Sequence, residues 1–220
     1  DLLKTNANIV KSVSKEIARV APDSIVIVVS NPLDVMAYVA LQETGFERER
    51  VIGMAGVLDT ARFRSFIALE LGVSVEDIQA LVLGGHGDTM VPLVSYTTVS
   101  GIPLTQFIGP EKLEELIERT RKGGAEIVGH LKTGSAYYAP SAAAVQMTES
   151  IVKDKRRILP CAAYLQGEFG YNDIFLGVPC VLGAKGLEKI IEVELTGAET
   201  EALADSVSAV KDTMNSLESL

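Results

Sequence analysis

Cysteine and histidine are both scarce in this sequence. Its 220 residues include two cysteines, Cys161 and Cys180, and two histidines, His86 and His130. Neither a Cys-x-x-Cys pair nor a His-Glu-x-x-His pattern occurs, so the usual spacings of zinc ligands are missing and we expect no metal site. Two unpaired thiols are typical of a reducing compartment. We therefore expect both cysteines to be small core residues of a cytoplasmic protein.

The chain also lacks an excess of positive charge and a long apolar run. It carries 20 Lys and Arg against 29 Asp and Glu, a net charge of −9, whereas a nucleic-acid surface needs concentrated cations. No apolar run approaches the roughly 20 residues of a membrane helix. Nucleic acid and membrane are therefore not expected as partners. The sequence opens at Asp1 without an initiator methionine or a signal-peptide pattern, and we expect it to belong to a longer polypeptide.

Helices and strands alternate in the first 53 residues. The β-branched run Ile25–Val29 predicts a strand with both faces covered. Asn31 follows as a candidate N-cap, with Pro32 at the first helical position. The pattern is completed by expected helices at Leu3–Val20 and Pro32–Glu43 and an expected strand at Val51–Gly53. This alternation indicates the C-terminal part of a doubly wound Rossmann α/β domain.

After Gly53 the pattern changes to that of a mixed α+β catalytic domain, so we predict two domains, 1–53 and 54–220. Gly183–Gly186 predicts a hairpin turn, and Thr196 is a candidate cap for the last helix. The pair Gly123-Gly124 interrupts a predicted helix without an evident reason. The expected helices are 56–71, 111–130, 140–152 and 198–217, and the expected strands are 80–83, 90–99, 158–165, 174–182 and 187–195.

His86 lies between glycines directly after a predicted buried strand, in Gly84-Gly85-His86-Gly87-Asp88. Glycine permits unusual backbone dihedral angles and the close approach of a ligand. A lone histidine is more often structural, but a histidine in a glycine-rich turn at a strand end favours acid/base catalysis. His130, near the end of an amphipathic helix, is interpreted as a surface or capping residue.

Asp59 and Arg62 lie three residues apart on a predicted helix and share one face of it. One interpretation is a local ion pair. The other places Arg62 in a cleft, where its guanidinium binds a substrate carboxylate through two hydrogen bonds while Asp59 orients the histidine. Arg64 points elsewhere and is interpreted as a surface residue. Asn31 also has two interpretations. It follows a strand, and the strand ends of open α/β sheets bind ligands, but a residue that only caps a helix needs no further function.

Together these segments resemble the lactate/malate dehydrogenase superfamily, and within it the lactate-dehydrogenase-like malate dehydrogenases of bacteria. The resemblance covers essentially all 220 residues. Three motifs match in order and spacing: Val28-Val29-Ser30-Asn31-Pro32-Leu33-Asp34, Gly53-Met54-Ala55-Gly56-Val57-Leu58-Asp59-Thr60-Ala61-Arg62-Phe63-Arg64, and Gly84-Gly85-His86-Gly87-Asp88.

The resemblance implies reversible, NAD-dependent oxidation of (S)-malate to oxaloacetate in a homodimer or homotetramer. It implies that His86 exchanges the proton of the substrate 2-hydroxyl, with Asp59 as its partner. Arg62 would bind the C1 carboxylate, and Asn31 the reacting oxygen. The residues implied at the NAD site are Asn6, Val29, Ser30 and Asn31.

Several features of the resembled family would precede Asp1. These are the Gly-x-Gly-x-x-Gly fingerprint, the acidic residue that selects NAD over NADP, and two lid arginines, one of which recognises the second carboxylate of malate. L-Lactate dehydrogenase, or another 2-hydroxy-acid dehydrogenase of the superfamily, therefore stays open as an alternative. An NAD-dependent glycosidase would need metal ligands that the sequence lacks. An oligomerising scaffold with a dead site is the non-enzymatic alternative.

Overall fold

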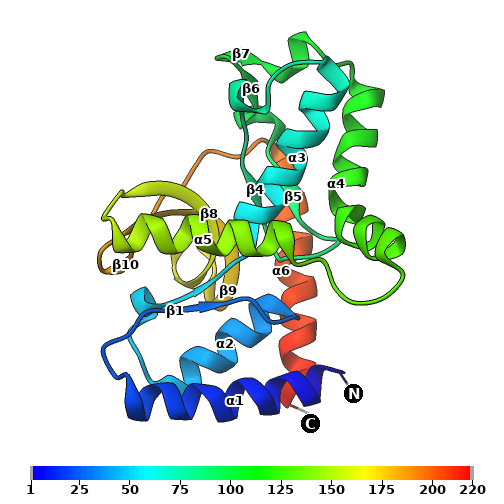
Figure 1. Ribbon diagram of the computed structural model, residues 1–220. Coiled ribbons are helices and arrows are strands. Elements are labelled where there is room, and N and C mark those ends of the chain that lie inside the picture. Colours follow the sequence, from blue (N-terminus) through cyan, green and yellow to red (C-terminus); the bar gives the residue numbers. More distant parts are fainter. Residues whose placement is uncertain (1, 219–220) are drawn as a thin grey trace.

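The computed structural model describes residues 2–218, and a five-stranded sheet of order β1-β2-β8-β9-β10 runs through it (Figure 1). β1 (Val26–Val28) and β2 (Val51–Gly53) are parallel. The remaining three strands, β8 (Arg157–Gln166), β9 (Asn172–Gly183) and β10 (Gly186–Ile190), are antiparallel. The predicted fold class, the end of a doubly wound α/β unit followed by a mixed α+β part, is confirmed. β2 joins β8 through the pair Gly53 and Ala162, so one sheet continues past residue 53. The division into domains 1–53 and 54–220 stays a prediction.

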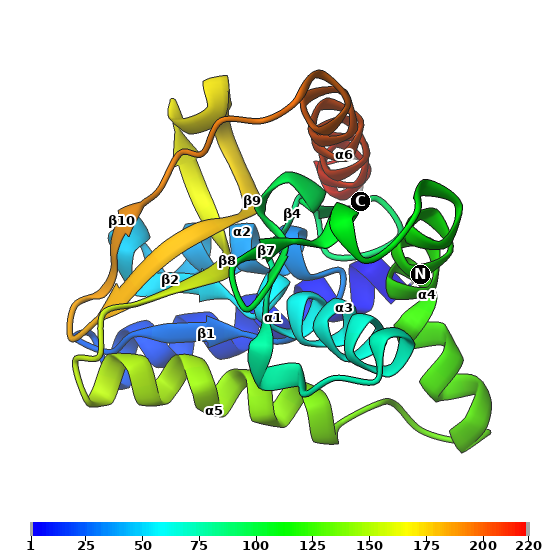
Figure 2. The ribbon, with the colours of Figure 1, turned by 90° about the horizontal axis from the view of Figure 1, so that it is seen from above.

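Six α-helices surround the strands within residues 2–218. α1 packs on α2 at one end of the molecule and α3 packs on α4 at the other, while α6 contacts both α2 and β9 (Figure 1). Figure 2 shows α5 and α6 on opposite sides of β8 and β9. The helices are α1 (Leu2–Val20), α2 (Leu33–Thr44), α3 (Gly56–Leu71), α4 (Pro110–Leu131), α5 (Tyr138–Val152) and α6 (Gly197–Glu218).

Two small ladders lie beside the main sheet. β3 (Ile78–Gln79), β6 (Thr98–Val99) and β7 (Ile102–Pro103) form one of them, and β4 (Val82–Leu83) pairs with β5 (Val91–Pro92) in the other. The strand expected at 80–83 is present but short, since only Val82–Leu83 pair. The single strand expected at 90–99 is wrong: a 3₁₀ turn at Val94–Tyr96 divides the segment, and its two halves join different ladders.

The expected helix start at Pro32 is also wrong. Pro32 has the extended angles φ −66° and ψ 121° and is itself the N-cap, so the helix begins at Leu33. The Asn31–Pro32 peptide bond is cis, and the Asn31 side chain makes no capping bond. By contrast, Thr196 caps α6 as predicted: its hydroxyl accepts from Glu199 N at 3.3 Å, and the Glu199 carboxylate accepts from Thr196 N at 3.0 Å.

The first strand is shorter and more open than its apolar sequence suggests. Only Val28 is buried in β1, and Val29 beyond its end is 45% exposed. The physical reason is that β1 is an edge strand of the sheet within residues 2–218, so one of its sides has no neighbour there. The last strand also differs from expectation. β10 ends at Ile190, and beyond its end the Glu192 carboxylate accepts a hydrogen bond from Phe169 N at 2.7 Å.

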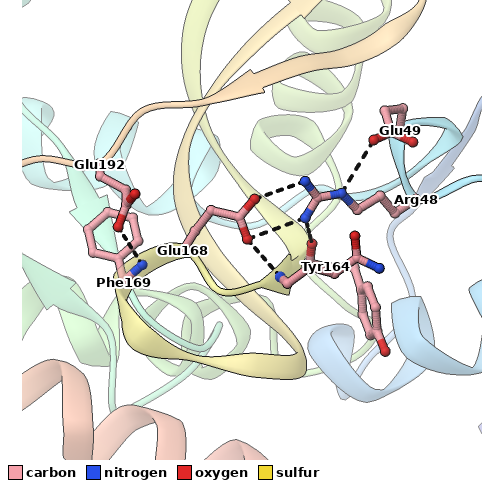
Figure 3. Close-up of polar contacts among 7 residues, drawn as sticks. Arg48, Glu49, Tyr164, Glu168, Phe169 and Glu192 are labelled. Atoms are coloured by element: carbon pink, nitrogen blue, oxygen red, sulfur yellow. Dashed lines mark hydrogen bonds and ion pairs between the residues drawn. The ribbon is translucent and has the colours of Figure 1, made fainter.

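An ion pair ties the β8–β9 turn to the segment that precedes β2 (Figure 3). Arg48 Nη2 donates to Glu168 Oε1 at 2.9 Å, and Arg48 Nη1 donates to the carbonyl of Tyr164 at 3.0 Å. Both charged side chains are about four-fifths buried, at 23% and 19% exposed. The second Glu168 oxygen accepts from Gln166 N at 2.7 Å, so the carboxylate is satisfied on both sides. The pair therefore holds the long hairpin against the first 53 residues.

Candidate active site

The loop that carries His86 is hydrogen-bonded to β9. Gly84 follows β4 and forms an isolated antiparallel bridge with Gly177, with N–H to O distances of 2.9 and 3.0 Å. Gly84 has φ +84°, a conformation that side chains rarely adopt, and a Cβ on Gly177 would collide with the Gly84 carbonyl. Glycine at both positions therefore lets the loop leave the strand and still pack on the sheet.

Two further amides of this loop are held by buried side chains from other helices. Gly85 N donates to the Ser206 hydroxyl of α6 at 2.8 Å, and His86 N donates to Asp34 Oδ2 of α2 at 2.8 Å. A Cβ on Gly85 would lie 2.6 Å from Val210 Cγ2. We expected glycine here to admit a ligand, but at Gly85 it admits helix α6 of the protein itself.

Helix α3 brings Asp59 and Arg62 to the same place. Its first residue, Gly56, sits so close to β4 that a Cβ would lie 2.7 Å from the Val82 carbonyl. The Thr60 hydroxyl accepts a hydrogen bond from Val82 N at 3.0 Å. Since β4 leads directly into the His86 loop, these contacts set the distance between the helix and the histidine.

Asp59 bonds both His86 and Arg62. His86 Nδ1 lies 2.8 Å from Asp59 Oδ2, and Arg62 Nη1 lies 3.4 Å from Asp59 Oδ1. The Asp59 side chain is buried, while His86 and Arg62 keep 16% and 12% of their side-chain surface exposed. The two sequence interpretations of Asp59 and Arg62 are therefore compatible, because one carboxylate serves the ion pair and the histidine together. Nε2 is the His86 nitrogen that remains for a ligand.

The pKa of His86 is raised. Burial alone lowers it, but the hydrogen bond to Asp59 and the negative charges of Asp59 and Asp34 outweigh the burial. The surroundings of the imidazole therefore favour its protonated form. A histidine bonded to a carboxylate through Nδ1 and facing a cleft with Nε2 can act as a general acid and general base.

His86 and Arg62 line a cavity of about 840 Å³ that opens between α3, α4 and the end of β1. Its apolar wall is made by Met54, Leu58 and Met90. The lining also includes Val29, Asn31 and Pro32 after β1, and Arg121, Gly124, Ala125, Val128, Ser135, Ala136 and Pro140 from α4 to the start of α5. A guanidinium, an imidazole and apolar side chains therefore meet in one cavity.

The expected NAD residues are not equally placed. Val29 and Asn31 line the cavity, whereas Ser30 is exposed and lies outside its lining. Asn6 Nδ2 donates to the Asn31 carbonyl at 2.7 Å, so Asn6 supports the turn after β1. An exposed valine at a strand end beside the Asn31 amide fits a flat ring that carries a carboxamide, as nicotinamide does.

The glycine pair in α4 has a clear structural reason. A Cβ on Gly123 would lie 3.2 Å from Arg62 Cδ, and a Cβ on Gly124 would lie 3.7 Å from Arg62 Nη2. The pair therefore leaves a slot along which the Arg62 side chain reaches the cavity. Arg64 is not a simple surface residue as expected: its Nη2 donates to the Val75 carbonyl at 2.7 Å, and burial lowers its pKa.

Other expectations concern residues outside this cavity. His130 is exposed in the last turn of α4, as expected. Cys161 and Cys180 are free and buried in the sheet. Within the part of the chain that the structure describes, no group of three His, Cys, Asp or Glu side chains could hold a metal ion. No helix among residues 2–218 is long and apolar enough to cross a membrane.

Sequence reasoning missed the cleft-lining residues Arg121 and Met90 and the buried Asp34. Neither residue carries a local signal: Arg121 reaches the cavity only through the packing of α4 against α3, and Met90 is one more apolar residue just after the His86 loop. Asp34 had a signal: an acidic side chain in the first turn of a helix that is otherwise apolar and buried. A charge in such a place needs a partner, which is an indication of function.

Two family models match the chain. The lactate/malate dehydrogenase NAD-binding domain matches residues 1–53, and the lactate/malate dehydrogenase α/β C-terminal domain matches residues 56–220. The malate dehydrogenase of Rhodopirellula baltica is 60% identical over 220 residues, which are 100% of this chain and 70% of that protein.

Solved structures agree in fold. The malate dehydrogenase of Salinibacter ruber matches with a TM-score of 0.98 at 56% identity, over 100% of this chain and 72% of that one. The lactate dehydrogenase of Cryptosporidium parvum, complexed with lactic acid and NAD, matches with a TM-score of 0.98 at 42% identity, over 100% and 71%. Malate and lactate enzymes thus share this backbone, and the greater sequence identity is to the malate enzymes.

Proposed function

This chain belongs to the lactate/malate dehydrogenase family, and we propose that the cavity around His86 is where it oxidises (S)-malate reversibly to oxaloacetate. Its activity is that of an NAD-dependent malate dehydrogenase. The observation that carries the site assignment is the 2.8 Å bond between His86 Nδ1 and Asp59, which leaves Nε2 for the substrate beside Arg62.

Each residue of the cavity has a distinct task in this proposal. Arg62 binds the C1 carboxylate through two parallel hydrogen bonds and so places C2 next to His86. His86 Nε2 takes the proton of the 2-hydroxyl, and Asp59 stabilises the imidazolium that forms. Asn31 hydrogen-bonds the reacting oxygen. NAD⁺ held beside Val29 and Asn31 would supply the acceptor for the hydride of C2. In the opposite direction, protonated His86 returns its proton to the ketone oxygen.

The residues proposed for NAD are Val29, Asn31 and the neighbouring Ser30 and Asn6, with Asn6 acting through the Asn31 carbonyl. Met54 and Leu58 give the cavity apolar lining beside Arg62. Where such side chains displace water, the attraction between Arg62 and a carboxylate is stronger.

The substrate is tested by comparing two ketones. We expect the full-length enzyme to reduce oxaloacetate with a kcat/KM at least about 100-fold above that for pyruvate, since a site built for a second carboxylate rejects a methyl group strongly. The measurement is NADH loss followed by absorbance. Equal or greater turnover of pyruvate would make the enzyme a lactate dehydrogenase, which the shared backbone also allows.

The kcat/KM values of the forward and reverse reactions should change in opposite directions with pH. Oxaloacetate reduction needs protonated His86, so its kcat/KM should fall as pH rises through the raised pKa of His86. Malate oxidation needs the neutral imidazole, so its kcat/KM should rise over the same interval. Both profiles should share one inflection above the ordinary histidine value of about 6.5. Two profiles that move in the same direction would remove His86 from the proton transfer.

The slot beside Arg62 gives a milder prediction. Gly123→Ala should push the Arg62 stem by a few tenths of an ångström and raise the KM for oxaloacetate about threefold to tenfold, because small displacements of a binding group weaken it. Gly129→Ala is the matched control on the same helix, since nothing lies within 4 Å of its Cβ. Both changes improve helix propensity, so equal KM values would show that the slot is unimportant.

A homodimer or homotetramer in the cytoplasm is also proposed. Three apolar side chains of α5, Tyr138, Val145 and Val152, are between 64% and 81% exposed, which supports a contact between subunits. Sedimentation velocity measures the subunit number. The free, buried thiols of Cys161 and Cys180 support a reducing compartment.

A further inference from the structure

Asp34 is a buried carboxylate that the reaction above does not use. It lies in the first turn of α2 and is 5% exposed. Its Oδ2 accepts a hydrogen bond from the backbone N–H of His86 at 2.8 Å. Its other oxygen, Oδ1, is buried without a hydrogen-bond partner among the described residues. A half-satisfied buried carboxylate is costly, so a neutral residue would serve better if only packing mattered.

The three consecutive amides of the histidine loop are anchored by three different groups. A backbone carbonyl of β9 accepts from Gly84, a serine hydroxyl accepts from Gly85, and a carboxylate accepts from His86. Neutral acceptors suffice at the first two positions. The ionisable anchor stands only at the residue whose own side chain changes charge during the reaction.

We propose that Asp34 is a positioning residue for the acid/base step, which fixes the main chain of His86 and places a second negative charge behind its imidazole. The inference rests on the proposed role of His86. Asp59 holds the ring from α3, and Asp34 holds the backbone from α2, so two carboxylates approach one histidine from two helices. Both anions favour the protonated ring, while Arg62 opposes it.

The surroundings of Asp34 contain few other charges. A small cavity of about 170 Å³ lies against Asp34 and His86. Asp88 of the same loop lines this cavity, and α6 contributes Ala209, Val210 and Thr213, none of them charged. Asp59 also faces Asp34 and adds a repulsion between the two carboxylates.

Asp34 and His86 are expected to titrate as a pair. Burial raises the pKa of Asp34 to about 6, against the hydrogen bond from the His86 amide and the charge of His86, which lower it. At neutral pH Asp34 is therefore an anion that stabilises protonated His86. As pH falls through about 6, Asp34 takes a proton and this stabilisation is lost.

Nuclear magnetic resonance tests the charge directly, because the chain has only two histidines. We expect Asp34→Asn to lower the titration midpoint of the His86 imidazole by about half a pH unit to one pH unit and to remove an inflection near pH 6. Glu43→Gln is the matched control, as it removes one negative charge from the other end of α2, where Glu43 pairs with Lys15. A His86 midpoint equal in the Asp34→Asn and Glu43→Gln variants would overturn the electrostatic role.

Steady-state kinetics tests the anchor. Asp34→Ala removes the oxygen that accepts from His86 N. It should lower kcat about tenfold to 100-fold with a smaller change in KM, because His86 is then no longer held in position. Asp34→Asn keeps an acceptor oxygen and should retain kcat within about threefold at its own pH optimum. If Asp34→Ala unfolds, the Asp34→Asn profile still decides: an unshifted pH–rate curve contradicts the proposal. If the wild-type enzyme does not reduce oxaloacetate but Asp34→Asn still lowers the His86 midpoint, the proposed function is contradicted and the electrostatic role of Asp34 is supported.

Discussion

Replacing His86 by Asn is expected to lower kcat for oxaloacetate reduction about 10²- to 10⁴-fold, the usual contribution of a positioned acid/base group. Asparagine is close to histidine in size and can donate a hydrogen bond to Asp59, so the loop should keep its anchors at Gly84, Gly85 and residue 86. It cannot carry a proton near neutral pH. The loss should therefore appear in kcat, measured by NADH absorbance, while NADH binding, measured by fluorescence, stays within about twofold because His86 is not among the residues proposed for NAD.

His130→Asn provides the comparison for this experiment. It makes the same substitution at the second histidine of the chain, which is exposed in the last turn of α4. Its kcat should equal that of the parent. A His86→Asn enzyme that keeps activity within a few-fold of the parent would place the proton transfer on another group.

Arg62→Lys should raise the KM for oxaloacetate about tenfold to 100-fold and change kcat less. A guanidinium binds a carboxylate through two parallel hydrogen bonds, whereas an ammonium is a compact point charge that cannot reproduce that geometry. One charge-assisted hydrogen bond is worth about 1.5–3 kcal/mol, which corresponds to this range. Arg62 Nε is buried without a partner among the described residues, so the side chain has binding capacity left for a ligand.

Arg64→Lys is the matched control. It distinguishes a loss of carboxylate binding by Arg62 from a general effect of lysine on α3. Arg64 lies two residues further along the helix and donates to the Val75 carbonyl instead of lining the cavity. Arg64→Lys should leave KM within about twofold and affect thermal stability alone. An unchanged KM in Arg62→Lys, or equal increases in both variants, would rule out Arg62 as the carboxylate-binding group.

Much of the fold follows from local sequence patterns. Glycine at 45 and 72 ends α2 and α3 with φ values of +62° and +65°, and Thr196 with Glu199 begins α6. The long strands β8 and β9 were predictable because their apolar residues form continuous buried runs. Short strands were not. The segment 90–99 satisfies a strand pattern, but its first half pairs with β4 across the His86 loop and its second half pairs with β3, which lies further back along the chain.

The site residues likewise follow partly from the sequence and partly from the tertiary structure. The sequence by itself determined which residues carry the chemistry: the glycine-flanked His86, the spacing of Asp59 and Arg62, and Asn31 after a strand, since these types and intervals are local. Only the tertiary structure decided their relations. It placed Asp59 between His86 and Arg62, turned Asn6 toward Asn31, explained Gly123-Gly124 through the Arg62 side chain, and brought the buried Asp34 under the histidine loop. Apart from the pair Asp59 and Arg62 within α3, these contacts join segments that are far apart in the sequence, and only packing brings such partners together.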